Sequence, residues 1–480
     1  MEHQRKLFQQ RGYSEDLLPK TQSQRTWKTF NYFTLWMGSV HNVPNYVMVG
    51  GFFILGLSTF SIMLAIIISA FFIAAVMVLN GAAGSKYGVP FAMILRASYG
   101  VRGALFPGLL RGGIAAIMWF GLQCYAGSLA CLILIGKIWP GFLTLGGDFT
   151  LLGLSLPGLI TFLLFWLVNV GIGFGGGKVL NKFTAILNPC IYVVFGGMAI
   201  WAISLVGLGP IFDYIPSGIQ KAENSGFLFL VVINAVVAVW AAPAVSASDF
   251  TQNAHSFREQ TLGLVVAYIL FAVAGVCIIA GASIHYGADT WNVLDIVQRW
   301  DSLFASFFAV LVILMTTIST NATGNIIPAG YQIAAIASTK LTYKEGVLIA
   351  SIISLLICPW KLMENQDSIY LFLDIIGGML GPVIGVMMAH YFVVMRGQIN
   401  LDELYTAPGD YKYYDNGFNL TAFSVTLVAV ILSLGGKFIP FMEPLSRVSW
   451  FVGVIVAFAA YALLKKRTTA EKTGEQKVTG

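Results

Sequence analysis

The chain has 480 residues, of which 57% are hydrophobic and only 10% are charged, and its formal net charge is +6. Soluble domains carry about 25% charged residues, so this composition excludes an ordinary soluble globular protein. Apolar runs near the ~20 residues that cross a bilayer recur along nearly the whole chain, and they predict a polytopic membrane protein.

Twelve membrane-spanning helices are predicted after a polar segment of mixed charge. Residues 1–28 lack the apolar core and cleavage site of a signal peptide, so the first span is expected to direct insertion. The predicted spans cover residues 29–55, 57–82, 104–136, 154–174, 183–206, 226–250, 261–284, 302–336, 345–360, 368–394, 420–437 and 446–464. The third and eighth are longer than a bilayer needs, so we expect them to tilt or to project into solvent.

The positions of the 28 Lys and Arg residues predict the orientation. If both termini are cytoplasmic, most of these residues fall on the inner side, as the positive-inside rule requires. Arg111 lies within the start of span three, and the outer side keeps only Lys137, Lys221, Arg299, Lys361, Lys437 and Arg447. The net charge therefore reflects topology and gives no ground for binding to nucleic acid.

Spans one and six are interrupted by proline and polar residues. The stretch WMGSVHNVPNYVMVGG in span one contains Ser39, His41, Asn42, Pro44 and Asn45. In span six the interruption consists of Trp240, Pro243, Ser246, Ser248 and Asp249. Proline removes an N–H group and frees carbonyls, which a membrane tolerates only where they are buried in protein or face a cavity. A substrate site explains so many polar neighbours better than a simple proline kink does.

The two interrupted spans are five apart, so one enters the membrane from the cytoplasm and the other from outside. Interruptions at equivalent places in halves of opposite topology indicate an inverted-repeat transporter with a site near the midplane. The expected organisation is a tail over 1–28, a transporter core over 29–394, with repeats 29–206 and 226–394, a cytoplasmic loop over 395–419, two further spans over 420–464 and a cytoplasmic tail over 465–480.

Two spans carry candidate binding residues. In span three, Trp119 and Gln123 are four residues apart and share one helical face, where an indole and an amide suit a planar ligand with N–H and C=O groups. Helix packing explains this pair equally well. The run TTISTNATGN in span eight is the most polar in any predicted span. Its hydroxyls, at Thr316, Ser319, Thr320 and Thr323, suit a monovalent cation, while Asn321 and Asn325 suit a substrate.

Other polar residues carry weaker predictions. His41 either contacts substrate or hydrogen-bonds a helix carbonyl. Asp249 is expected to cap a helix or pair with a basic loop. Asp374 in span ten is a functional candidate as an intramembrane acid, and Arg111 is one guess among several for its partner. The five cysteines show no metal-ligand spacing, so no bound cofactor is expected.

The motifs NYFTLWMGSVHNVPNY, NGAAGSKYGVPFAMILRASYGVRGA, AIMWFGLQ, SDFTQ, TISTNATGNIIPAGY and CPWKLM resemble the nucleobase:cation symporter-1 family, and bacterial allantoin permeases most. The resemblance runs from about Arg25 to the last span. It implies an inverted repeat of five helices, with the first and sixth broken, followed by two further helices. It also implies uptake of purines, pyrimidines, hydantoins or allantoin together with sodium ions or protons.

The resemblance assigns roles to individual residues. It makes Trp119 the stacking tryptophan, Gln123 a substrate-binding glutamine and Trp240 the second aromatic wall. It places Asn325 on the amide edge of the ring and Asn42 within reach of the ligand. The implied sodium site takes backbone carbonyls from Gly38, His41 and Thr316 and hydroxyls from Ser319 and Thr320.

These features together predict a multi-pass plasma-membrane (inner-membrane) carrier that imports allantoin with sodium or a proton by alternating access. Allantoin is neutral and dense in N–H and C=O groups, which matches the expected pocket of tryptophans and amides. Expected partners are this substrate and membrane lipid, and a monomeric state is compatible with the sequence. Three alternatives stay open: a nucleobase or hydantoin permease of the same family, an amino-acid carrier of the same superfold, and, remotely, an intramembrane enzyme.

Overall fold

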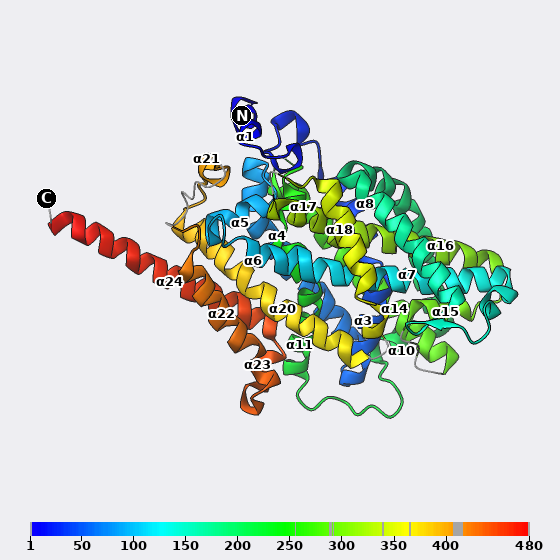
Figure 1. Ribbon diagram of the computed structural model, residues 1–480. Helices are drawn as coiled ribbons and strands as arrows, with labels where there is room; N and C mark the ends of the chain where they lie inside the picture. The colour runs from blue at the N-terminus through cyan, green and yellow to red at the C-terminus, as the bar shows by residue number, and fades with distance from the viewer. Residues whose placement is uncertain are drawn as a thin grey trace.

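The computed structural model describes residues 2–254, 256–287, 290, 292–337, 340–363, 366–406 and 416–478. Within these residues the protein is a bundle of helices, and strands occur only in the antiparallel hairpin of β1 (Thr150–Leu151) and β2 (Leu154–Ser155). Figure 1 shows the N-terminal segment at one edge of the bundle and the end of α24 (Ser449–Val478) projecting from it. The predicted all-α fold is confirmed.

The first five spans follow the predicted order. Span one is α2 (Thr29–Val40) with α3 (Val43–Phe52), and span two is α4 (Thr59–Tyr87). Span three joins α6 (Leu105–Gly108), the π-helical turn η4 (Leu109–Ala115) and α7 (Ala116–Ile138). Spans four and five share α8 (Leu156–Ile191), which continues through the π-helical turn η6 (Tyr192–Gly196) into α9 (Gly197–Val206). The gap predicted between residues 174 and 183 is instead a kink at Gly176, whose φ of 58° suits a residue without a Cβ atom.

The second half repeats this pattern. Span six is α11 (Ser225–Val239), α12 (Ala241–Val245) and α13 (Ser248–Thr251), and span seven is α14 (Phe257–Tyr286). Span eight joins α16 (Leu303–Asn321), the π-helical turn η7 (Ala322–Ile326) and α17 (Ile327–Ile336). The remaining spans are α18 (Tyr343–Leu356), α20 (Gln366–Ala389) with the π-helical turn η8 (His390–Val394), α22 (Leu420–Leu434) and α24.

Short elements connect these spans. They are α1 (Glu2–Gln10), η1 (Glu15–Leu17), η2 (Gln22–Gln24), η3 (Phe53–Leu55), α5 (Phe91–Tyr99), η5 (Pro140–Thr144), α10 (Leu208–Asp213), α15 (Val293–Gln298), α19 (Trp360–Met363), α21 (Leu401–Leu404), η9 (Gly435–Lys437), η10 (Pro440–Met442) and α23 (Glu443–Ser446). Residues 407–415 of the predicted loop lie outside the described part of the chain.

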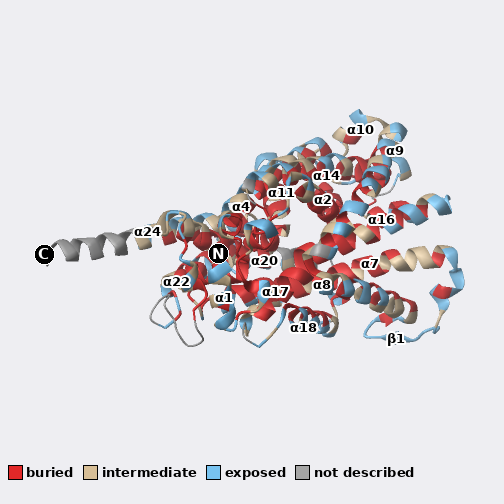
Figure 2. Ribbon diagram, turned by 90° about the horizontal axis from the view of Figure 1, so that it is seen from above, coloured by how far each residue is buried: buried red, intermediate tan, exposed pale blue. Residues whose placement is uncertain are grey.

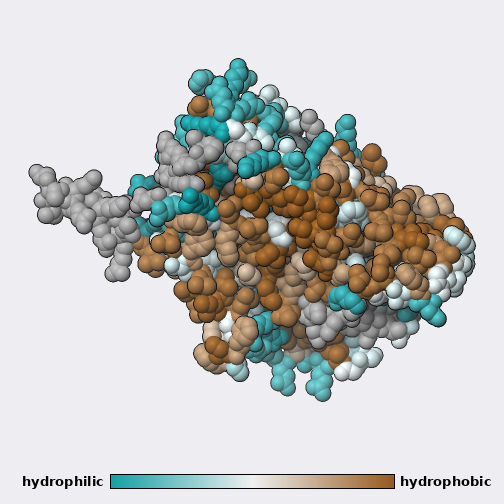
Figure 3. All heavy atoms as spheres, in the orientation of Figure 1, coloured by the Kyte–Doolittle hydropathy of each residue, from teal (hydrophilic) through white to brown (hydrophobic). Residues whose placement is uncertain are grey.

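Eight helical segments in the described residues are long and apolar enough to cross a membrane. The other four predicted spans do not meet this criterion. Spans one and six are broken into shorter helices, and α18 has only 14 residues. The last span meets it only when α24 is taken together with the bent segment before it. The two long spans, 105–138 and 303–336, each have 34 residues, close to the prediction. Figure 3 shows apolar side chains over the broad middle of the molecule, with hydrophilic ones toward the top and the lower edge.

Both interruptions are real breaks whose free backbone groups find partners. The side chain of Asn42 accepts a hydrogen bond from the Asn45 amide (3.1 Å), and Pro44 lies in the first turn of α3, so the sequence itself starts a new helix here. In span six, Asn80 of α4 donates to the carbonyls of Ala244 and Val245 at 2.9 and 2.8 Å. Such partners let a broken helix persist at membrane depth.

The N-terminal segment, predicted above as a tail over 1–28, packs against residues that follow span ten. Phe8 is buried and stacks on Tyr405, with ring centroids 4.3 Å apart. The hydroxyl of Tyr405 donates to the Leu17 carbonyl (2.5 Å), and Tyr13 donates to the Thr406 carbonyl (2.9 Å). These contacts join residues nearly 400 positions apart, which a local hydropathy pattern does not reveal.

The most buried part of the bundle lies where the two halves meet. In Figure 2 buried residues concentrate at the centre, around α2, α17 and α20, while the far ends of α9 and α16 are largely exposed and that of α7 is intermediate. The two broken spans reach this centre, and α2 packs against both α14 and α16. The fold thus brings the interruptions of spans one and six together around one small cavity.

Candidate substrate site

A small cavity of about 40 Å³ lies between the two broken spans, α7 and η7. Its lining residues are Ser39, Asn42, Asn45, Trp119, Gln123, Val239, Trp240, Ala242, Pro243, Thr320, Gly324 and Asn325. Five of the seven predicted substrate residues line this cavity, and the other two, His41 and Asn321, do not. The volume suits one or two water molecules, so a flat ring can enter only if the side chains move apart.

The two tryptophans that line the cavity are held by other aromatic side chains. Trp240 packs edge-on against Trp36 and Tyr268, with ring centroids 5.6 and 5.4 Å away. Trp119 meets Phe372 of α20 at 5.7 Å. Through Trp119 the wall of the cavity thus packs on span ten, where the sequence analysis named Asp374 but not Phe372. The available signal was an aromatic residue just before the segment DIIGGMLGP (residues 374–382).

Two polar atoms of the cavity have no hydrogen-bond partner among the described residues. They are the amide oxygen Oε1 of Gln123 and the indole Nε1 of Trp240, both buried. A buried polar group without a partner costs about 1–3 kcal/mol, so native proteins pair nearly all of them. Gln123 Oε1 is a hydrogen-bond acceptor, and Trp240 Nε1 is a donor. Together they match a ligand that presents both an N–H and a C=O group.

Asn321 supports the site from behind. Asn325 donates through Nδ2 to Oδ1 of Asn321 (2.9 Å), and Asn321 donates in turn to Oδ1 of Asn169 (3.1 Å) and to the Phe120 carbonyl (3.2 Å). The chain of amides fixes which edge of Asn325 faces the cavity, so Asn321 acts as a positioning residue. Sequence reasoning missed Asn169, although a lone asparagine inside a predicted span was a usable signal.

The residues predicted to hold a cation also converge. The Thr320 hydroxyl lies 2.9 Å from the Ser39 and Thr316 carbonyls and 3.5 Å from the Gly38 carbonyl. Ser319 Oγ is buried and has no partner among the described residues. A Cβ atom on Gly38 would lie 2.6 Å from that oxygen, so only glycine leaves the hydroxyl and the end of α2 this close. Hydroxyl and carbonyl oxygens are the ligands that hard cations prefer.

His41 lies beside this region but faces away from the cavity. Its Nδ1 is 2.9 Å from the Tyr46 hydroxyl, and its ring stacks on Phe195 at 4.7 Å and meets Phe271 edge-on at 5.6 Å. The side chain therefore belongs to an aromatic cluster, and its predicted contact with substrate has no support in the geometry. Its predicted carbonyl role belongs to the end of α2, where His41 is the C-cap residue.

Three charged residues of the predicted spans have partners in the structure, and one guessed pairing differs. Arg111 is fully buried and donates to Ser246 Oγ (3.1 Å) and to the Gly324 carbonyl (2.7 Å), so it ties η4 to spans six and eight. The guessed pairing of Arg111 with Asp374 is wrong, because Asp374 Oδ2 lies 2.5 Å from Lys437 Nζ in η9. Asp249 accepts from the Phe91 amide (2.9 Å) and caps α5, which confirms its predicted role.

Within the described residues no three or more His, Cys, Asp or Glu side chains are grouped to hold a metal ion. Any cation at this site would therefore be held by the carbonyls and hydroxyls of spans one and eight. The same spans line the substrate cavity through Ser39 and Thr320. Binding of an ion and of a ring would thus draw on adjoining turns of the same two helices.

Comparisons with known proteins give the same picture. The model of a family described as permeases for cytosine/purines, uracil, thiamine and allantoin matches residues 19–453. The chain is 97% identical to a protein of Escherichia coli strain K12 named "Putative allantoin permease", over the full length of both. It is 38% identical to the allantoin permease of Bacillus subtilis strain 168, covering 94% of this chain and 93% of that one.

A solved structure shares the fold. It is Mhp1, a nucleobase-cation-symport-1 family transporter, in a closed conformation with bromovinylhydantoin bound. It superposes with a TM-score of 0.76 over 96% of both chains at 23% identity. The family model matches most of the chain. The broken spans one and six and the long spans three and eight agree with a transporter of this family. The protein is a multi-pass membrane transporter and belongs to the cytosine/purine, uracil, thiamine and allantoin permease family.

Proposed function

We propose that this transporter imports allantoin across the plasma membrane together with a cation. The observation that carries the proposal is the pair of unpartnered polar atoms, Gln123 Oε1 and Trp240 Nε1, in a cavity that Trp119 and Asn325 also line. Allantoin has a flat hydantoin ring and a ureido tail, both dense in N–H and C=O groups. Its ring would stack on an indole while its amide edges pair with Gln123, Asn42 and Asn325.

The charge of the cavity also fits a neutral ligand. None of its lining residues is ionisable. A zwitterionic amino acid would need charged partners or free helix ends, so this cavity favours a neutral amide-rich ring over an amino acid. The names of the Escherichia coli and Bacillus subtilis relatives support allantoin among such rings.

Alternating access follows from how the cavity is enclosed. Side chains from spans one, three, six and eight close around it, and Phe372 of span ten covers Trp119. In the proposed cycle the cation binds first and orders the end of α2, substrate then binds between the tryptophans, and a four-helix bundle rocks against the scaffold. The segment DIIGGMLGP folds over the outer mouth. Both termini lie in the cytoplasm, as the distribution of Lys and Arg supports.

Uptake of radiolabelled allantoin tests the proposal. Cells that express the protein should show saturable uptake that unlabelled allantoin blocks and that uracil, cytosine and hydantoin block less. Each assay is run with and without sodium and with the proton gradient collapsed, so that the dependence identifies the ion. Uptake of a nucleobase or hydantoin in place of allantoin would contradict the substrate and leave the transporter fold untouched.

The replacement Ser319→Ala tests the cation site. If sodium drives uptake, the sodium concentration for half-maximal uptake should rise about tenfold, which corresponds to the ~1.4 kcal/mol expected for a lost ion ligand. Thr317→Ala is the matched control, because the Thr317 hydroxyl bonds only to the Ile313 carbonyl of its own helix (2.8 Å). An equal effect of both replacements, or none from Ser319→Ala in a sodium-driven carrier, would rule out this site.

A further inference from the structure

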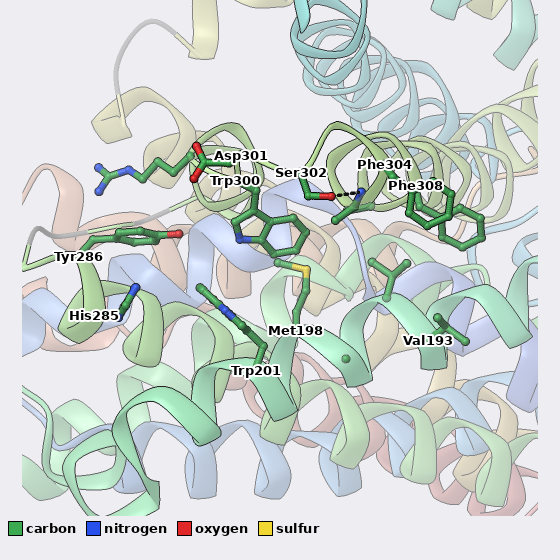
Figure 4. A pocket seen from close by; sticks show the side chains of 15 residues that line it. Val193, Met198, Trp201, His285, Tyr286, Trp300, Asp301, Ser302, Phe304 and Phe308 are labelled. Carbon is green, nitrogen blue, oxygen red and sulfur yellow. Dashed lines mark hydrogen bonds between the residues drawn. The ribbon is translucent and has the colours of Figure 1, made fainter.

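A second cavity, of about 820 Å³, lies away from the substrate site (Figure 4). It is walled by α9, by the C-terminal end of α14 and by the segment that leads into α16. None of its lining residues lines the small central cavity. In the predicted orientation these helix ends lie on the outer side of the membrane. The transport cycle proposed above uses none of these residues, so the cavity calls for another explanation.

The lining of this outer cavity changes from polar to apolar along its length. In Figure 4, Tyr286, His285 and Asp301 gather at one end, while Val193 and Phe308 lie at the other. At the polar end the guanidinium carbon of Arg299 lies 4.8 Å from the ring centroid of Tyr286. One positive and one negative side chain therefore stand at the same end as His285 and Tyr286, while the opposite end is apolar. This arrangement is amphipathic, as a lipid is.

The apolar end opens onto the surface that a membrane would cover. Phe304 is 78% exposed and Val193 is 67% exposed, and both line the cavity. Between the two ends Trp201 and Trp300 meet edge-on, with ring centroids 5.8 Å apart. Tryptophan side chains favour the boundary between lipid tails and headgroups. A lipid can therefore enter sideways from the bilayer with its headgroup at the polar end.

We propose that the outer cavity binds one phospholipid with a zwitterionic headgroup bearing a primary ammonium, as in phosphatidylethanolamine. The Arg299 guanidinium would bind the phosphate, for which its planar fork of donors is suited. The Asp301 carboxylate would accept hydrogen bonds from the ammonium group. An acyl chain would lie along Val193, Met198 and Phe308. An anionic headgroup would instead bring an uncompensated negative charge against Asp301, so the cavity selects the zwitterion.

Two neighbouring glycines allow a matched test of this site. Gly197 lines the cavity and Gly196 does not. A Cβ atom on either residue meets nothing within 4 Å, and both residues have ordinary helical backbone angles. The replacement Gly197→Leu therefore places a side chain inside the cavity, whereas Gly196→Leu adds the same side chain to the same helix outside it. Neither change strains the backbone.

Native mass spectrometry of the full-length purified protein measures lipid retention directly. The delipidated protein is supplied with dioleoyl phosphatidylethanolamine, phosphatidylcholine or phosphatidylglycerol. We expect one phosphatidylethanolamine per chain, held about tenfold more tightly than the other two lipids. Gly196→Leu should retain it as the wild type does, and Gly197→Leu should lose it at least about tenfold. Soluble glycerophosphoethanolamine should not compete, because it lacks the acyl chain.

A charge variant tests the headgroup contact independently, in case Gly197→Leu destabilises the protein. Asp301→Asn, at an exposed position, should abolish the preference for phosphatidylethanolamine over phosphatidylcholine while leaving one lipid bound. Equal retention of the three lipids by the wild type would overturn the proposal. So would unchanged retention by Gly197→Leu. These measurements do not involve transport, so they are independent of the substrate that the carrier proves to import.

Discussion

Replacement of Trp119 by alanine is expected to reduce allantoin uptake at least about tenfold, with the protein still present in the membrane. The indole forms one wall of the central cavity, and its loss removes a stacking surface and leaves a void beside Phe372. Aromatic contacts and the associated apolar area contribute upward of ~1.4 kcal/mol, which corresponds to that factor. Gln123→Ala should have a comparable effect, because it removes the acceptor Oε1.

The control for this prediction is Trp139→Ala, which removes the same side chain from the end of the same helix. Trp139 is 55% exposed and lies outside the cavity. Its replacement should leave uptake close to the wild-type rate. Uptake is measured at substrate concentrations below half-saturation, and membrane abundance is measured in parallel. Wild-type uptake by either Trp119→Ala or Gln123→Ala would show that the cavity is not the substrate site.

Replacement of Arg111 by methionine is expected to destabilise the protein and to impair uptake together. The guanidinium joins η4 to Ser246 in the broken span six and to the Gly324 carbonyl in η7. Methionine keeps most of the volume but donates no hydrogen bond, so the Gly324 carbonyl loses its partner in the interior. We expect the free energy of unfolding to fall by about 2 kcal/mol, the cost of such a buried group. Gly324 also lines the cavity, so uptake should fall as well.

Thermal unfolding in detergent, read as loss of the monodisperse peak, measures the stability change. Arg258→Met serves as the control, because Arg258 is exposed at the start of α14. Arg111→Lys retains the charge but cannot span both acceptors in a planar fork, so its effect should fall between those of methionine and the wild type. If Arg111→Met melts and transports like the wild type, the contacts to spans six and eight do not support the site.

Local patterns in the sequence were sufficient for much of the fold. Hydropathy located the twelve spans to within a few residues at most edges, because an apolar run of bilayer length needs no tertiary partner to be recognised. Asn is favoured at a helix N-cap and Pro in the first turn, so Asn42 and Pro44 made the break in span one predictable. The shared face of Trp119 and Gln123 follows from helical geometry alone.

Long-range contacts decided two features that the sequence did not reveal. The N-terminal segment packs on Tyr405 through Phe8, and nothing in its own composition distinguishes it from a solvated tail. Asp374 pairs with Lys437, while Arg111 reaches Gly324, which is 213 positions further along the chain. A buried charge must have a partner, but the sequence does not say which of several residues meets it.

Composition, broken spans and motifs were enough to predict a polytopic carrier with two broken helices and a polar site where they meet. Which polar side chains face that site depends on the packing of the helices. Asn321 lies behind Asn325, and His41 turns into an aromatic cluster, although both are as polar and as central as the residues that line the cavity. The physical reason is that helical periodicity fixes how residues share a face. The direction in which that face points depends on packing between helices that are distant in sequence.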